Sequence, residues 1–445
     1  PANTLSLHDA LPIYDVAIIG SGILGSTLAA SLALSGRSVL LVERDLSEPD
    51  RIVGELLQPG GCIAMRKLGI DDCLEGMDSV QVEGYKVFWG KDQVAIPYPT
   101  EKTEMGWSEG GVGIGERKQE GRSFHHGRFV QKLRGKAQST KGVTLVEATV
   151  NELIEDEHTK AIIGITATPK KSSSPATPTD SHDAPIRYYA SLTLVTDGCF
   201  SKFRRALLPS HIAPLVRSNF VGLILEDADL PAPHHGHVIL RRSSASDSSS
   251  DTPGVGPVLV YQLGTHETRM LVDLPGSRVP SSSNGDLARY LETHVTPMLP
   301  PSILPSFRTA LKKSSSGEAE YRLRSMPNSF LPAYPQGREL QGAILAGDSL
   351  NMRHPLTGGG MTVAMNDAVI LTELLGGGRQ VGEIVGDKRG VADLEKWEEV
   401  GERLEEWHWR RKGVSTCINV LAQALYSLFG ADGAFVTLVH TLNAR

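Results

Sequence analysis

The sequence has few cysteines and few aromatic residues. Aromatic residues make up 6% of the 445 residues, and the four cysteines are Cys62, Cys73, Cys199 and Cys417. These cysteines form no C-x-x-C pair and no cluster with histidine, which excludes a zinc ribbon and a disulfide-rich secreted scaffold. Cysteines this sparse are typical of a reducing compartment, such as the cytosol or the cytosolic face of a membrane.

The sequence also lacks a cluster of positive charge. The formal net charge is −6 and no long basic run occurs, so no nucleic-acid partner is indicated. His125 and His126 are adjacent, but no carboxylate or third histidine stands at ligand spacing. We therefore expect a structural role for this pair and predict no metal site.

An initiator methionine is missing as well. Residues 3–13 resemble a translated sequencing adapter, so we interpret residues 1–13 as a non-native scar and exclude them from the fold prediction. The rest of the chain is long enough for about two to three domains with a large core.

A glycine-rich turn follows the first apolar run. Residues 14–19 predict a strand, a G-x-G-x-x-G turn and a helical pattern follow, and a second strand over 38–42 ends at Glu43. An acidic residue ~20 positions after the turn is typical of a dinucleotide fold, where it binds ribose hydroxyls while the glycines admit a pyrophosphate. The three glycines are Gly20, Gly22 and Gly25.

Two later strands end in aspartate and glycine. One ends at Asp197, and the other, over 343–346, is followed by a Pro- and Gly-rich loop that opens a helix. Ligands of open α/β sheets bind at the carboxyl ends of strands, and a helix N-terminus favours negative charge. Asp348 is placed either to accept hydrogen bonds from ligand hydroxyls or to cap this helix. The candidate contacts here are Gly347, Asp348, Gly359, Gly360 and Met361.

Three arginines are further candidates for the cofactor site. Arg44 follows the acidic residue of the second strand, and Arg128 follows a glycine at the start of a predicted helix. Arg51 could pair with a phosphate, or with Asp50 or Glu55 at the surface, and its spacing does not distinguish between these interpretations.

The remaining segments suggest a second domain and a helical end. Alternating apolar residues between 220 and 334 predict an antiparallel sheet, residues 101–122 a loop, and the Ser- and Pro-rich inserts 169–185 and 243–256 exposed loops. The predicted division is a nucleotide domain over 14–84, 122–219 and 335–378, a substrate domain over 85–121 and 220–334, and a helical segment over 391–445 that we expect to be truncated.

The C-terminal segment divides into two parts of different composition. Residues 391–412 predict a charged helix with an aromatic side formed by Trp397, Trp407 and Trp409. Residues 413–431 carry no charge but include several polar side chains, so a core helix and a helix in a membrane interface both remain open.

The order of these motifs resembles the single-component flavin monooxygenases, the group that contains p-hydroxybenzoate hydroxylase. Several segments resemble the squalene monooxygenase (squalene epoxidase) family more closely, and together the likeness covers residues 14–429, with the polar inserts as the main departures. The segments are 51–61, 124–129, 198–204, 267–273, 323–327 and 347–363. The implied fold is α/β: a Rossmann-type FAD-binding domain, an antiparallel-sheet substrate domain and a C-terminal helical, membrane-associated segment.

The resemblance implies epoxidation of squalene to (S)-2,3-oxidosqualene with O₂, in sterol biosynthesis. It implies bound FAD that reacts through a C4a-hydroperoxide, NADPH as a transient electron donor, and NADPH–cytochrome P450 reductase as partner. It further implies a membrane lipid surface, on the cytosolic face of the endoplasmic reticulum or on lipid droplets. Squalene has no polar handle, so a long apolar pocket is expected.

The resemblance also implies site residues. By position, the FAD contacts are Glu43, Arg51, Arg128, Asp348 and Met361. Tyr85 matches an active-site tyrosine and Gln58 its hydrogen-bond neighbour; spacing alone favours Tyr85 as a strand residue that fills the core. The rivals are a soluble FAD-dependent aromatic hydroxylase, a non-catalytic flavin- or prenyl-binding escort protein, and a chain that binds FAD without turnover.

Overall fold

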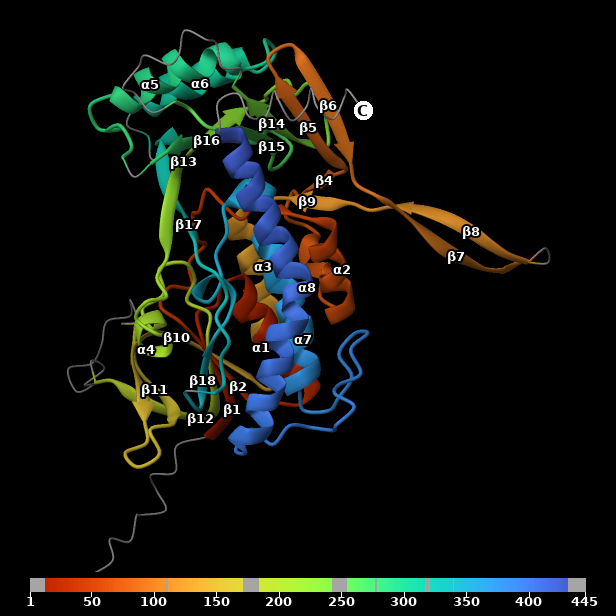
Figure 1. Ribbon diagram of the computed structural model, residues 1–445, viewed down its shortest axis with the longest axis vertical. Coiled ribbons are helices and arrows are strands. Elements are labelled where there is room, and N and C mark those ends of the chain that lie inside the picture. Colours follow the sequence, from red (N-terminus) through yellow and green to blue (C-terminus); the bar gives the residue numbers. More distant parts are fainter. Residues whose placement is uncertain are drawn as a thin grey trace, which may run out of the picture.

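Two sheets, one above the other, organise the protein (Figure 1). The computed structural model describes residues 13–108, 111–170, 184–241, 254–276, 278–316, 318, 321–338 and 340–430. Most of the two predicted inserts and of the N-terminal scar lie outside the described residues, as do residues 431–445.

The six-stranded sheet forms the nucleotide-binding layer. Its strands β18, β12, β1, β2 and β10 run parallel, and β11 pairs antiparallel with both β10 and β12. β1, β2 and β18 are mostly apolar because helices cover the sheet, as the continuous apolar runs predicted, whereas β10 and the first half of β12 carry polar residues. The strands are β1 (Ile13–Ile19), β2 (Val39–Glu43), β10 (Val143–Glu155), β11 (Ile162–Pro169), β12 (Ile186–Val195) and β18 (Ala343–Leu345).

The largest buried cluster combines this sheet with several helices, three of which lie next to the cavity described below. They are α1 (Ile23–Ser35), α3 (His126–Ser139) and α7 (Gly360–Leu375). Because β1, β12 and β18 are adjacent and parallel, their carboxyl ends meet at one edge. That edge brings Gly20, Asp197 and Gly347 together from three distant parts of the sequence.

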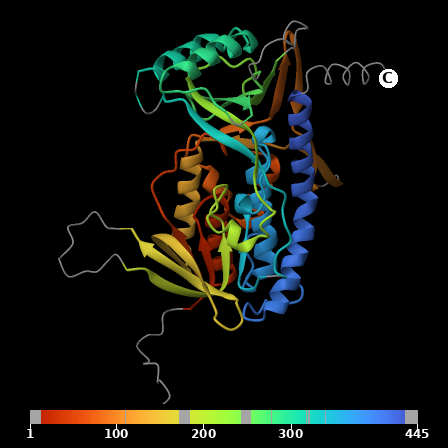
Figure 2. The same ribbon diagram turned by 60° about the vertical axis from the view of Figure 1, so that its left-hand side comes forward.

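The seven-stranded sheet has the order β17-β13-β16-β15-β14-β5-β6. Its neighbouring pairs are antiparallel, as predicted, except that β14 and β5 run parallel. Helices α5 (Asp286–Val295) and α6 (Leu304–Ser314) cover its outer face (Figure 2). The strands are β5 (Gly84–Trp89), β6 (Asp92–Pro97), β13 (Leu215–Glu226), β14 (His235–Leu240), β15 (Val258–Gln262), β16 (Glu267–Pro275) and β17 (Arg324–Phe330).

Short elements join the two layers. A small sheet of β3, β9 and β4 lies between them, the helix α2 packs on α7 in the nucleotide layer, and the turns η5 and η6 precede α7. Their bounds are β3 (Leu56–Leu57), β4 (Val80–Val82), β9 (Gly121–Ser123), α2 (Pro59–Leu68), η1 (Asp71–Leu74), α4 (Arg204–Leu207), η3 (Thr296–Met298), η5 (Gly347–Ser349) and η6 (Pro355–Thr357).

The predicted loop over residues 101–122 is wrong. β7 (Thr100–Ser108) and β8 (Gly111–Lys118) pair as an antiparallel hairpin that extends away from the body (Figure 1). The composition misled the prediction, because polar and glycine-rich residues are typical of loops. The backbone ladder between the two arms forms the hairpin nevertheless.

The C-terminal segment is one helix rather than two parts. α8 (Trp397–Gly430) begins six residues later than predicted and continues through Gly413 along α7 (Figure 1). The predicted aromatic side is wrong, because Trp407 is buried whereas Trp409 is 61% exposed. Residues two apart on a helix point ~200° away from each other.

The uncharged half of α8 has both a packed and an open side. Ala422 is buried, whereas Val420 and Leu421 are 61% and 50% exposed. Within the part of the chain that the structure describes, no helix is both long and apolar enough to cross a membrane.

A buried ion pair fastens α8 to α7. Arg411 donates to both carboxylate oxygens of Asp367 at 2.9 Å, and Trp407 Nε1 donates to the same carboxylate at 3.1 Å. We expect Asp367→Ala to lower the free energy of unfolding by about 3–5 kcal/mol, because it leaves a buried guanidinium uncompensated. Urea unfolding measures this. Glu373→Ala, which breaks the half-exposed pair with Arg410 between the same helices, should cost under about 1 kcal/mol. Equal losses would contradict the prediction.

Candidate active site

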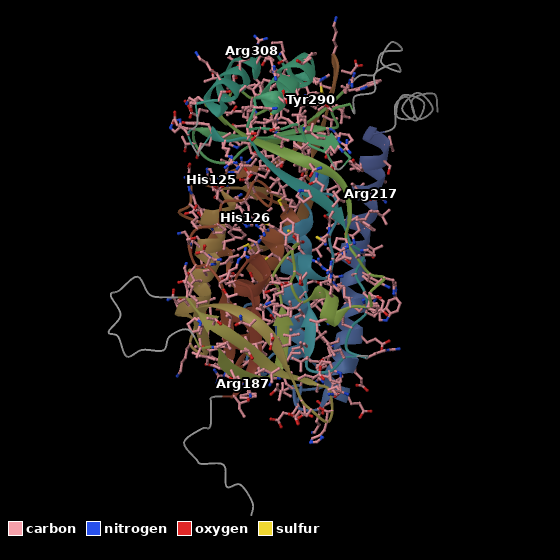
Figure 3. The ribbon with its side chains drawn as sticks, turned by 90° about the vertical axis from the view of Figure 1, so that its left-hand side faces the viewer. His125, His126, Arg187, Arg217, Tyr290 and Arg308 are labelled. Carbon is pink, nitrogen blue, oxygen red and sulfur yellow. The ribbon has the colours of Figure 1, made fainter. Side chains whose placement is uncertain are left out.

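A cavity of about 580 Å³ lies between the two sheets. Its lower wall comes from the carboxyl ends of β1, β2, β12 and β18, and its upper wall from the inner face of the seven-stranded sheet. His126, at the start of α3, lines it at the level between the layers (Figure 3). The cavity therefore joins the predicted nucleotide motifs to the predicted substrate sheet.

Glu43 organises the end of the cavity nearest β1. Its carboxylate accepts the Ser21 backbone N–H at 2.8 Å and lies 3.5 Å from Arg134 Nη2. Arg134 Nε donates to the Ser21 carbonyl at 3.0 Å, and its Nη1 donates to the Ser47 carbonyl at 2.9 Å. Burial lowers the pKa of Arg134, opposed by the charge of Glu43, and the guanidinium remains a cation.

The glycines of the first motif serve two different purposes. A Cβ on Gly25 would lie 1.9 Å from the Gly20 carbonyl oxygen, so Gly25 permits the close packing of turn and helix rather than lining the cavity. A Cβ on Gly22 or Gly360 would meet no described atom within 4 Å, and both residues line the cavity. The missing side chains leave room for a group to cross both loops, at the N-termini of α1 and α7.

Acceptors and donors without partners face this space. The Asp348 carboxylate is exposed in the cavity, and no hydrogen bond to it from another described residue occurs. Among the described residues, Asp197 Oδ1 and Arg353 Nε and Nη1 are buried without a hydrogen-bond partner. Arg51 and Met361 line the same region. Unpaired buried polar atoms are costly, so a polar ligand fits here.

Tyr85, Gln58 and Tyr98 form a hydrogen-bonded group beneath the second sheet. Tyr98 donates its hydroxyl proton to Gln58 Oε1 at 2.5 Å, and Gln58 Nε2 bonds the Tyr85 hydroxyl and the Thr357 carbonyl, the latter at 3.0 Å. Tyr85 Oη lies 3.4 Å from the same carbonyl. Burial raises the pKa of Tyr85 to about 12, so its phenol stays neutral and can donate a proton in a hydrogen bond at physiological pH.

The comparisons agree on one family. A family model described as squalene epoxidase matches residues 189–441, and one described as an FAD binding domain matches residues 13–131. The squalene epoxidase erg1 of Schizosaccharomyces pombe is 42% identical over 415 residues, which is 93% of this chain and 78% of that protein. The squalene epoxidase erg1 of Aspergillus fumigatus is 44% identical over 424 residues, 95% and 76% of the two chains. This chain belongs to the squalene epoxidase family.

Solved structures agree on the fold of this squalene epoxidase family member. PqsL of Pseudomonas aeruginosa in complex with 2-aminobenzoylacetate has a TM-score of 0.66 at 16% identity, covering 96% of this chain and 100% of that one. The p-nitrophenol 4-monooxygenase PnpA of Pseudomonas putida has a TM-score of 0.64 at 15% identity, covering 97% and 93%. At these identities the likeness shows the FAD-dependent monooxygenase fold alone.

One predicted FAD contact of this family member is misplaced. Arg128 does not line the cavity but lies 4.0 Å from Asp78 and 3.9 Å from Glu267 in partly exposed ion pairs. Arg134, six residues later on α3, occupies the place beside Glu43. Six residues turn a helix by ~600°, so the two arginines point to different sides.

The other predicted residues divide into lining and supporting positions. Gly25, Gln58 and Gly359 do not line the cavity. A Cβ on Gly359 would lie 2.4 Å from Ile418, so this glycine lets α8 approach the loop before α7. The cavity is lined by Gly20, Gly22, Glu43, Arg44, Arg51, Tyr85, Asp197, Gly347, Asp348, Gly360 and Met361.

Sequence reasoning missed a buried charged group in the cavity wall. Arg269 donates from Nε and Nη2 to the two oxygens of Glu55, both at 2.8 Å, and the Tyr261 hydroxyl donates to Glu55 Oε2 at 3.2 Å. A single arginine within the apolar strand Arg269-Met270-Leu271-Val272 was the available signal, because a charge there requires a buried partner.

Arg134 is the basis of a binding prediction. We expect Arg134→Ala to weaken FAD binding by about 10-fold to 10²-fold, because it removes a cation and two fixed donors from the Glu43 end of the cavity. Fluorescence titration of the FAD-stripped protein measures the Kd. Arg128→Ala on the same helix is the matched control, with a change under 2-fold. A larger loss for Arg128→Ala would restore it to the site.

His126 predicts a pH dependence of stability. Burial lowers its pKa to about 4, while its Nδ1–H donates to the Gly54 carbonyl at 2.9 Å. Above pH 6.5 both folded and unfolded states hold it neutral. Between pH 6.5 and 4 only the unfolded state is protonated, so stability falls with falling pH, by about 2 kcal/mol from pH 7 to 5. Urea unfolding of His126→Asn should show a smaller fall over this range, and an identical fall would contradict the assignment.

Proposed function

We propose that this chain catalyses the FAD-dependent epoxidation of squalene to 2,3-oxidosqualene, with O₂ and electrons from NADPH, in sterol biosynthesis. Membership of the squalene epoxidase family supports this activity. The structural observation that supports it best is the cavity that runs from nucleotide-binding loops to an apolar sheet face. FAD, when bound, supplies the redox chemistry that activates O₂ and transfers one oxygen atom to the alkene.

The lower wall would hold the dinucleotide. Glu43 accepts hydrogen bonds from ribose hydroxyls in this proposal, while Arg134 holds Glu43 and the Ser21 carbonyl in place. The open space at Gly22 and Gly360 admits the pyrophosphate and the flavin end, at two helix N-termini that favour negative charge. Asp348 offers a free acceptor to ligand hydroxyls.

The upper wall would hold squalene. Buried apolar side chains surround Tyr85 and exclude water from the reacting alkene. Tyr85 and Gln58 keep a neutral, oriented donor beside this compartment. The buried members of the cluster are Ile52, Phe220, Val238, Leu240, Leu259, Tyr261, Leu263, Leu271 and Leu356.

The domain organisation and the subcellular location are part of the same proposal. In this proposal, residues 14–84, 122–219 and 335–378 form the domain that binds FAD. Residues 85–121 and 220–334 form the domain that binds the substrate. The exposed apolar residues Val420 and Leu421 support a membrane lipid surface on the cytosolic face of the endoplasmic reticulum or a lipid droplet. NADPH–cytochrome P450 reductase is the proposed electron-delivering partner.

Product analysis tests the function. Purified protein in detergent is incubated with FAD, NADPH, a P450-type reductase and squalene, and extracts are analysed for 2,3-oxidosqualene. Epoxide that depends on the protein and NADPH is expected. Bound FAD with no epoxide would contradict turnover by this chain, and no bound FAD would overturn the cofactor as well. Hydroxylation of 4-hydroxybenzoate instead would support a soluble aromatic hydroxylase.

A further inference from the structure

A buried polar network lies between the seven-stranded sheet and the loop before α7. Ser218 of β13 donates its hydroxyl proton to Asp273 Oδ1 of β16 at 2.5 Å, and Asn328 Nδ2 of β17 donates to the same oxygen at 3.1 Å. His354 Nε2, from the loop, lies 3.0 Å from Ser218 Oγ and 3.3 Å from Asp273 Oδ1. All four side chains are at most 3% exposed. The buried carboxylate needs these donors to offset its lost hydration.

His354 forms hydrogen bonds with both the turn η6 and the seven-stranded sheet. The Leu356 backbone N–H donates to Nδ1 at 3.2 Å, so Nδ1 is an acceptor and Nε2 carries the proton directed at Ser218 and Asp273. The imidazole thus caps the turn η6 on one side and binds the sheet on the other. Tyr426 of α8 stacks on it, with ring centroids 4.2 Å apart and planes inclined by 21°.

The capped turn carries the acceptor of the proposed catalytic pair. Thr357 ends η6, and its carbonyl accepts from Gln58 Nε2 at 3.0 Å and faces the Tyr85 hydroxyl at 3.4 Å. This carbonyl is only three residues from the imidazole. Any displacement of the capped turn therefore moves the group that orients Tyr85.

We propose that His354, anchored by Asp273, is a positioning residue for Tyr85 and Gln58. The seven-stranded sheet and α8 fix the imidazole, the imidazole fixes η6, and η6 fixes the Thr357 carbonyl. The kinetic consequence rests on the proposed epoxidase function, whereas the geometric consequence at Tyr85 does not. The proposal gives a role to Asp273 and Asn328, neither of which lies at the nucleotide end of the cavity.

Two substitutions of His354 separate its two bonds. In His354→Asn the amide oxygen can still accept the Leu356 N–H, but the side chain is too short to reach Asp273. In His354→Gln the amide N–H can still donate to Asp273, but the Leu356 N–H loses its acceptor. Both variants are expected to lower kcat for epoxidation by about 10-fold to 10²-fold. The KM for squalene and the FAD content per chain should stay within about 2-fold. In a Tyr85→Phe background the same substitutions should cost less than about 2-fold further, because the group they position is gone.

The matched control is Asn219→Ala, beside Ser218 on β13. It removes one partly buried hydrogen bond, from Asn219 Nδ2 to the Gly276 carbonyl, outside the network, so kcat should be unchanged. If the His354 variants fail to fold, Asp273→Leu cuts the same link from the sheet side. Losses that add fully to that of Tyr85→Phe would overturn the proposal.

A second readout does not depend on turnover. With 3-fluorotyrosine at position 85 in the FAD-loaded protein, the ¹⁹F resonance should shift in His354→Asn, His354→Gln and Asp273→Leu but not in Asn219→Ala. An unshifted resonance in these three variants would overturn the positioning role. Absence of epoxide from the unsubstituted protein would refute the proposed function alone, since the fluorine signal would still decide the geometry.

Discussion

Asp348→Ala is expected to give a folded protein that loses FAD on purification. The carboxylate lies in η5, shortly after β18, exposed in the cavity and not bonded to another described side chain, so its acceptors are available to a ligand. Charge-assisted hydrogen bonds contribute about 1.5–3 kcal/mol each. Losing one or two weakens binding by about 10²-fold or more.

The measurement is the flavin absorbance per chain after gel filtration, with Kd from titration of the stripped protein. Asp348→Asn keeps an acceptor oxygen and should retain part of the affinity. Asp286→Ala, at the start of α5 on the outer face of the seven-stranded sheet, is the control and should keep full flavin content. A fully loaded Asp348→Ala protein would remove Asp348 from the site.

Tyr85→Phe is expected to keep FAD but lower epoxidation by about 10²-fold. The substitution preserves the ring in its strand and removes only the hydroxyl that meets Gln58 and the Thr357 carbonyl. Because the loss is confined to the reacting side of the cavity, the flavin content and the unfolding midpoint should change little.

Steady-state assays with squalene, with parallel measurement of flavin content, test this prediction. Tyr188→Phe on β12 is the control, because that tyrosine is half-buried in the nucleotide sheet and does not line the cavity. Wild-type turnover in Tyr85→Phe would show that Tyr85 only fills the core. Lost flavin would show instead that Tyr85 supports the fold of the cofactor site.

Residues tied to local backbone chemistry could be predicted from the sequence. The glycine turn and the aspartates after β12 and β18 line the cavity because strand ends and helix starts place them there. The phase of a helix is harder to infer: the sequence favours Arg128, whereas Arg134 faces the cavity. An arginine beside a glycine gives no information about which side of α3 meets the sheet.

Contacts between distant segments also could not be predicted from the sequence, because they depend on how the two sheets pack. Glu55 and Arg269 lie far apart in the chain, and only the packing of the second sheet over the first brings them to 2.8 Å. The continuity of α8 through Gly413 is not evident from the sequence, because the composition changes there although the helix does not end. Packing against α7 holds that helix together across the change.

β18 is translated long after the strands it pairs beside, which affects how the chain folds on the ribosome. β1 occupies residues 13–19, but β18, which completes the sheet beside β12, comes only at residues 343–345. At 5–20 residues per second, roughly 16–65 s separate the translation of these strands. The whole second sheet is made in that interval, so nascent chains that end before residue 345 should not retain the flavin. The growing chain must keep an incomplete, apolar sheet from aggregating until its last strand has emerged.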